Sequence, residues 1–86
     1  MEIKNIQVGK INNREEFISF LEVFYSDYQK NGENWENNDL GRFLEALLAW
    51  TKDADGYYKN NNIKINPNNA SWRVFADILM GARIYE

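Results

Sequence analysis

Apolar residues recur at helical spacing in three separate stretches of the chain. In the first, one continuous arc of a helical wheel holds Phe17, Ile18, Phe20, Leu21, Phe24, Tyr25 and Tyr28. Asn13 precedes the stretch as an N-cap, and Glu16 follows at the spacing of a capping box. We therefore predict a first helix over residues 14–30, ended by a left-handed residue at Asn31-Gly32.

The second stretch predicts a helix over residues 38–55, with Asn37 or Asn38 as its cap and Gly56 as its terminator. Its apolar arc is unusually wide, about 200° on a helical wheel. The arc contains Leu40, Phe43, Leu44, Leu47, Leu48, Trp50, Thr51 and Ala54. So wide an arc indicates contact with two neighbouring elements.

The third stretch predicts a helix over residues 70–85 that is apolar on almost every side. It follows Pro67, and Asn69 or Ser71 is its cap. One face holds Trp72, Phe75, Ala76, Leu79 and Ala82, and a nearly opposite face holds Val74, Ile78 and Tyr85. A helix of this kind is enclosed on several sides, so the rest of the chain, or a partner protein, is expected to surround it.

The remaining segments leave two interpretations open. Ile6 and Val8 alternate with polar residues, and so do Ile63 and Ile65 in the long polar loop before the last helix. The first interpretation is an N-terminal arm lying across the helices, and the second pairs that arm with residues 62–66 as a two-stranded ribbon. The predicted fold is all-α, a small three-helix antiparallel bundle with an N-terminal arm, in a single domain over residues 1–86.

Composition narrows the classes of function. The 86 residues contain no cysteine and no histidine, which removes disulfides, thiolate metal sites and every His-dependent catalytic triad. A net charge of −3 argues against a nucleic-acid-binding surface. No signal peptide is visible and no run reaches the roughly 18 apolar residues of a membrane span, so we expect a cytoplasmic protein without membrane contact.

Candidate metal chemistry is confined to residues 51–62. Aligning Gly56 with the turn glycine of a calcium loop puts Asp53 and Asp55 at two ligand positions. Thr51 and Asn62 then occupy positions that need charged ligands. We therefore predict a solvated helix end here, with no metal site, no cofactor and no catalytic residues.

Two single residues have more than one interpretation. Trp35 lies in a short polar loop, where a Trp either closes the top of a core or anchors a partner. Arg83 falls within the apolar arc of the last helix and extends along the core to water, or pairs with Asp39, Glu36 or an acid of a partner. Arg73 and Asp77 are four residues apart, the spacing of a surface ion pair.

Several short motifs together resemble an uncharacterised family of short bacterial helical proteins, catalogued as a domain of unknown function. They are Trp35-Glu36-Asn37, Leu40-x-x-Phe43-Leu44-Glu45-Ala46, Gly56-Tyr57-Tyr58, Ser71-Trp72-Arg73 and Ala82-Arg83-x-Tyr85-Glu86. The resemblance covers about residues 13–86. It implies a helical domain with no known activity, and it marks Trp35, Glu36, Tyr57, Tyr58 and Arg83 as candidate binding residues.

The leading expectation is a non-enzymatic protein-binding domain, of an immunity or regulatory type. It is motivated by missing catalytic chemistry and by surplus aromatic and apolar residues, the types enriched at interface anchors. The partner is an unidentified protein or a second copy of the chain. The alternative is a small ligand- or metal-binding protein that uses carboxylates and Arg83.

Overall fold

The computed structural model describes residues 2–85, and in that range the chain is all-α. It contains four α-helices: α1 (Arg14–Asn31), α2 (Leu40–Lys52), α3 (Ala54–Asn60) and α4 (Trp72–Ile84). Short 3-10 turns occur at η1 (Ile3–Asn5), η2 (Val8–Lys10) and η3 (Gly32–Asn34). Met1 and Glu86, which the predicted domain includes, lie outside the described residues.

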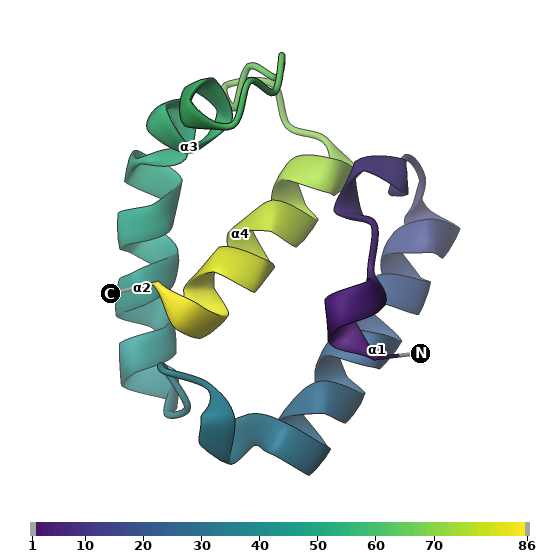
Figure 1. The fold of residues 1–86 in the computed structure, drawn as a ribbon, viewed down its shortest axis with the longest axis vertical. Helices are drawn as coiled ribbons and strands as arrows, with labels where there is room; N and C mark the ends of the chain where they lie inside the picture. The colour runs from purple at the N-terminus through teal and green to yellow at the C-terminus, as the bar shows by residue number, and fades with distance from the viewer. Residues whose placement is uncertain (1, 86) are drawn as a thin grey trace.

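Helix α4 is the element about which the others pack. It contacts α2 most extensively, and it also contacts α1 and η2. In Figure 1 it lies nearer the viewer than α1 and α2 and runs between them. The backbones of α1 and α2 stay apart, and the rings of Phe24 and Phe43 meet between them with their centroids 6.5 Å apart. The expectation that the last helix is enclosed on several sides is confirmed.

The core consists of two clusters on different faces of α4. The first gathers Ile11, Phe20, Phe24, Trp35 and Ala76, and the second gathers Trp50, Ala54, Tyr58 and Val74. Ile78 and Tyr85 pack against the second cluster. The face of α4 formed by Val74, Ile78 and Tyr85 is therefore covered by the chain itself and needs no partner.

Gly81 marks the closest approach of α4 to α2. A Cβ atom at this position would stand 2.6 Å from Cγ of Trp50, and closer still to Cδ1 of the same ring. Real Cβ atoms essentially never come that near, so α4 reaches this depth because residue 81 has no side chain. The indole of Trp50, itself buried, fills the space that any larger residue would need.

The predicted three-helix count is wrong because the second predicted helix is interrupted. Helix α2 ends at Lys52, Asp53 departs from helical geometry with φ −94° and ψ 6°, and α3 begins at Ala54. The change of direction lets Ala54 and Tyr58 reach the second cluster. Gly56 lies inside α3 and ends no helix.

The predicted ribbon is also wrong, and residues 2–85 contain no strand. Ile6 and Val8 pack against the first cluster, whereas Ile63 and Ile65 pack against the second. The backbone N–H of Ile63 donates to the carbonyl of Tyr58 at 2.9 Å, and that of Ile65 donates to Ile63 at 3.0 Å. The two segments thus lie on different clusters, and these two donors are used locally.

The N-terminal end of α1 agrees closely with the end predicted from the sequence. Asn13 Oδ1 accepts a hydrogen bond from the backbone N–H of Glu16 at 2.8 Å, as predicted. The Glu16 carboxylate accepts from the N–H of Asn12, one residue before the predicted one, at 2.9 Å. At the other end Gly32 is right-handed, with φ −56°, and the chain tightens into η3 without the predicted left-handed residue.

The caps of α2 and α4 are short polar side chains. Asp39 caps α2 by accepting from the N–H of Arg42 at 2.8 Å, so the predicted Asn37 or Asn38 cap is corrected. Ser71 caps α4, as one of the two predicted alternatives. Its hydroxyl oxygen accepts a hydrogen bond at 3.1 Å from the N–H three residues on.

Candidate functional site

An open groove of about 410 Å³ lies between α1 and α2. No residue of α4 lines it. Leu21, Tyr25 and Tyr28 of α1 form one wall of the groove. Leu40, the first residue of α2, lies in the opposite wall. The groove exists because the backbones of α1 and α2, which both pack on α4, stay apart, while the rings of Phe24 and Phe43 meet beneath the groove.

The floor of the groove is a set of packed aromatic rings from Phe24, Trp35 and Phe43. The ring centroids of Phe24 and Trp35 are 4.9 Å apart, and those of Trp35 and Phe43 are 6.2 Å apart in a stacked arrangement. Trp35 Nε1 donates to the Asp27 carboxylate at 2.7 Å, which satisfies the only polar atom of the indole. The floor is therefore fixed before any ligand arrives.

An apolar surface continues from the groove along both helices. Ile18 precedes Leu21 by three residues, and Leu44 and Leu48 extend the Leu40 wall at four-residue spacing. We call this surface the α1/α2 face and define it by Ile18, Leu21, Tyr25, Tyr28, Leu40, Leu44 and Leu48. Each of these side chains is between 37% and 72% exposed.

The structure does not bring the predicted binding residues into one site. Trp35 is buried and lies in the groove floor. Glu36 is exposed beside it, and its backbone carbonyl accepts from the Arg42 guanidinium. Tyr57 and Tyr58 belong to α3, at the far end of α2: Tyr57 is exposed, and Tyr58 is fully buried. Of the motif residues predicted to bind, only Trp35 lines the groove.

Arg83 lies half-buried near the end of α4, outside the groove lining. Its Nε atom is buried and has no hydrogen-bond partner within the described residues. The ion pairs found in that range are Lys4–Glu2, Arg42–Asp39 and Arg73–Asp77, so Arg83 pairs with neither Asp39 nor Glu36.

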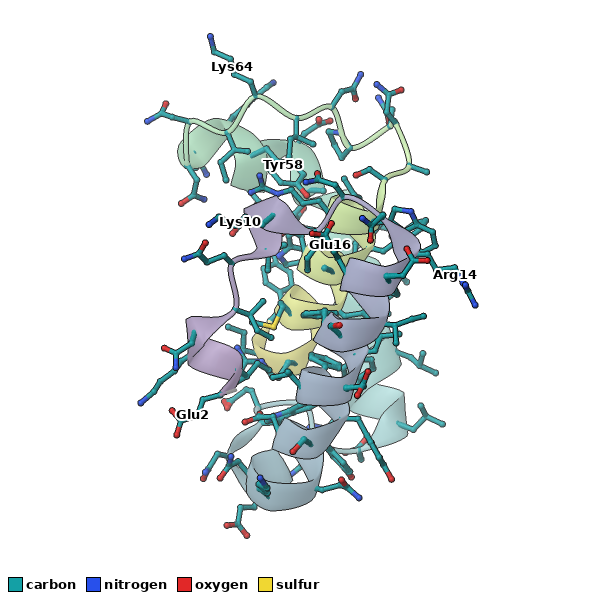
Figure 2. The ribbon with its side chains drawn as sticks, turned by 90° about the vertical axis from the view of Figure 1, so that its right-hand side faces the viewer. Glu2, Lys10, Arg14, Glu16, Tyr58 and Lys64 are labelled. Carbon is teal, nitrogen blue, oxygen red and sulfur yellow. The ribbon has the colours of Figure 1, made fainter. Side chains whose placement is uncertain are left out.

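Arg73 and Asp77 are part of a buried polar cluster, which corrects the predicted surface pair. Asp77 is 7% exposed. Its Oδ2 accepts from Arg73 Nε at 3.3 Å and from the Tyr58 hydroxyl at 2.6 Å. Figure 2 shows Tyr58 between α3 and the N-terminal part of α4. Burial raises the pKa of Tyr58 well above its usual range, and the hydrogen bond to Asp77 raises this pKa further.

Asn37 joins the start of α2 to the end of α4. Its side-chain amide donates to the carbonyls of Ala82 at 3.0 Å and Tyr85 at 2.6 Å, and its backbone N–H donates to the carbonyl of Arg83 at 3.1 Å. These are carbonyls that the end of a helix leaves without partners. Asn37 is itself buried. This motif residue, like Tyr58 and Arg73, holds the fold together.

Replacing Asn37 by alanine is expected to lower the free energy of unfolding by about 2 kcal/mol, because a buried carbonyl and a partly buried one lose their donor. Asn38→Ala is the matched control, since Asn38 is exposed and its side chain has no such role. It should change stability by less than about 0.5 kcal/mol. Urea denaturation of both variants measures the difference, and equal effects would contradict the role given to Asn37.

The candidate calcium loop folds in another way. Residues 54–60 form α3, so the backbone does not wrap around a central ion there. Within residues 2–85 no three carboxylates gather closely enough to hold a metal ion. In the same range no helix combines the length and the apolarity needed to cross a bilayer.

None of the seven residues of the α1/α2 face was among the predicted binding residues. Tyr25 and Leu44, for example, were assigned to the apolar arcs that build the core. One signal was present: the second predicted helix had an apolar arc of about 200°, more than one packing surface needs. The position of the exposed surface could not be predicted without knowing which side of α2 is covered by α4.

Comparisons with known proteins give one match. A family model described as "Family of unknown function (DUF7660)" matches residues 13–86. No curated protein and no solved structure matches the chain. The matched range is the one predicted from the motifs, although Glu86, the last motif residue, lies outside the described residues.

Proposed function

The chain belongs to this family of unknown function, and from the geometry of its own residues we propose that it is a non-enzymatic protein-binding domain. The proposed binding surface is the α1/α2 face with its aromatic floor. A regulatory or immunity-type role in the cytoplasm is the biological setting we propose for such a surface.

The observation that carries the proposal is the amount of exposed apolar surface on this face. Leu40 is 72% exposed, Tyr25 63% and Leu48 56%. Soluble monomers rarely expose apolar patches larger than a few hundred Å², and larger ones mark interaction sites. Tyr25 and Tyr28 are of the residue type most enriched at the centres of protein interfaces.

The chemistry of the groove favours a protein over a small polar ligand. Its walls and floor consist mainly of Leu, Phe, Tyr and Trp side chains, and the Trp35 N–H is already bonded to Asp27. A polar substrate would find few partners, whereas the apolar side of a helix would find a continuous surface. The alternative built on carboxylates and Arg83 draws no support from this groove, because Arg83 does not line it.

Capture from an extract of the cells that produce the protein tests the proposal. The tagged wild-type chain is compared with Leu44→Glu, which places a charge in the middle of the α1/α2 face. We expect the variant to retain less than about a tenth of the captured partner, because burying an unpaired carboxylate costs more than one factor of ten in affinity.

Gln7→Glu is the matched control, because it adds the same charge through an exposed residue of the N-terminal arm. Figure 2 shows that arm and α2 on opposite sides of α1. The control should capture the partner as the wild type does. Equal capture by all three proteins would show that the α1/α2 face is not the binding surface, provided that circular dichroism confirms folding of each.

A further inference from the structure

We infer that the α1/α2 face binds a second copy of this chain, in a symmetric dimer whose two α2 helices lie antiparallel. The inference rests on the proposed function, because it names the partner of the same surface. The twofold axis passes near Leu44. In this arrangement Leu44 meets Leu44 of the second copy, and Leu40 meets Leu48 of the second copy.

Self-complementary shape is the first argument. The α1/α2 face contains both a ridge and a groove: Leu40, Leu44 and Leu48 form a ridge at four-residue spacing, and the groove lies beside it. Two such ridges placed antiparallel bring leucine against leucine along their whole length. The ridge is also symmetric about Leu44, so a twofold operation maps it onto itself, as an isologous interface requires.

The area of the face is the second argument. Its seven side chains expose on the order of 600 Å², taking roughly 150–200 Å² for one fully exposed side chain of this size. Two copies would bury at most about 1,200 Å², the lower limit for specific interfaces. A single amphipathic helix would cover the groove and leave part of the ridge in water. The size predicts a reversible, concentration-dependent dimer.

Gly41 is the third argument. It lies in α2, three residues before Leu44, and has no positive φ. A Cβ atom there would meet only Asp39 Oδ1, at an ordinary 3.5 Å. No contact within the single chain therefore requires glycine at position 41. Alanine would favour the helix more than glycine does there. Gly41 thus leaves room beside Leu44 for the close approach of a second helix.

Charge does not oppose the pairing. None of the seven residues of the α1/α2 face is ionisable at neutral pH, and Asp39, which lines the groove, is paired with Arg42 at 3.6 Å. The net charge of −3 per chain is small. Long-range repulsion between two copies is accordingly weak at physiological ionic strength.

Disulfide trapping tests the register, because the chain has no cysteine of its own. In the proposed dimer Leu44→Cys places two thiols next to the twofold axis, within disulfide reach. Mild oxidation should convert most of this variant to a covalent dimer at low micromolar concentration. A mixture of Leu40→Cys and Leu48→Cys should give the heterodimer. Gln7→Cys, on the far side of α1, is the control and should stay monomeric.

Sedimentation velocity on the purified protein completes the test. Wild type and Gln7→Glu should approach twice the 10.2 kDa chain mass as concentration rises to about 100 µM. Leu44→Glu should raise the dissociation constant at least about 100-fold, since two carboxylates would face each other across the axis. Its circular dichroism should match the wild type.

A wild-type protein that stays monomeric at that concentration would overturn the second-copy inference. A dimer that survives Leu44→Glu and leaves Leu44→Cys unlinked would overturn it too, because the copies would then meet through another face. The proposed function would still stand in both cases if cell-extract capture depended on Leu44. If neither capture nor self-association responded to Leu44→Glu, both proposals would fail.

Discussion

Replacing Gly81 by alanine is expected to lower the free energy of unfolding by about 3 kcal/mol, the upper end of the usual range for adding a carbon to a packed core. The added Cβ would overlap three atoms of the Trp50 ring. Trp50 is buried and belongs to the second cluster, so its ring has no free space into which to turn. Helix α4 must then separate from α2 along its most extensive contact.

Gly56→Ala is the matched control for this variant. Gly56 lies in α3, has no positive φ, and a Cβ there would meet nothing within 4 Å. Alanine should stabilise the protein at this position by about 0.5–1 kcal/mol, through helix propensity and reduced freedom of the unfolded chain. Urea denaturation should therefore show changes of opposite sign in the free energy of unfolding for Gly81→Ala and Gly56→Ala. The m-value should be unchanged in both variants.

A second substitution separates crowding from other causes. Combining Gly81→Ala with Trp50→Phe should cost less than the sum of the two single changes, because the smaller ring vacates part of the space that the new methyl needs. Strict additivity would mean that the contact between residues 50 and 81 does not limit the approach of α4 to α2.

The sequence predicted the helices well where their pattern is local. The bounds of α1 and its Asn13 cap depend on residues next to each other in the chain, and both were predicted within one residue. The break at Asp53 was missed because Leu40, Trp50 and Ala54 form one uninterrupted arc. Beyond the break, Tyr58 of α3 packs in one cluster with Val74 and donates to Asp77, both of which are distant in the chain. Contacts with residues distant in the chain cannot be predicted from a helical wheel.

The candidate site was predicted less well, for a related reason. A wheel tells which residues are apolar, but it does not distinguish a residue in the core from one on an open face. Leu44 and Ala46 are both apolar members of α2, yet Leu44 is exposed and Ala46 is buried. Tyr58, an aromatic residue of the motifs, was predicted to bind a partner, but it is packed inside the chain. The position of α4 decides which side of α1 and α2 stays open.

The buried cluster of Asp77, Arg73 and Tyr58 supports the second large prediction. Asp77→Ala is expected to lower the free energy of unfolding by about 3 kcal/mol at neutral pH. The change removes the acceptor of the Tyr58 hydroxyl and the counter-ion of Arg73, and both lie in the interior or at its edge. Asp55→Ala, at an exposed position of α3, is the control and should change stability by less than about 0.5 kcal/mol.

Alkaline pH provides a second readout that packing alone would not change. In the folded protein, burial and the Asp77 carboxylate raise the pKa of Tyr58 above the value near 10 of an unfolded chain. The unfolded state therefore loses this proton first. Stability is unaffected below about pH 10 and falls as pH rises beyond it, by up to about 1.4 kcal/mol per pH unit for this one proton.

Asp77→Ala should make this alkaline fall shallower, because one of the causes of the raised pKa is gone, and Tyr58→Phe should remove the contribution of residue 58 altogether. Denaturation in urea between pH 8 and pH 11 measures the slope for both variants and for Asp55→Ala. If Asp77→Ala kept the full wild-type slope up to pH 11, burial without the Asp77 hydrogen bond would be enough to hold the tyrosine proton over this range. The cost of Asp77→Ala in stability would then come from lost packing, which Asp77→Asn would restore, or from the lost counter-ion of Arg73, which it would not.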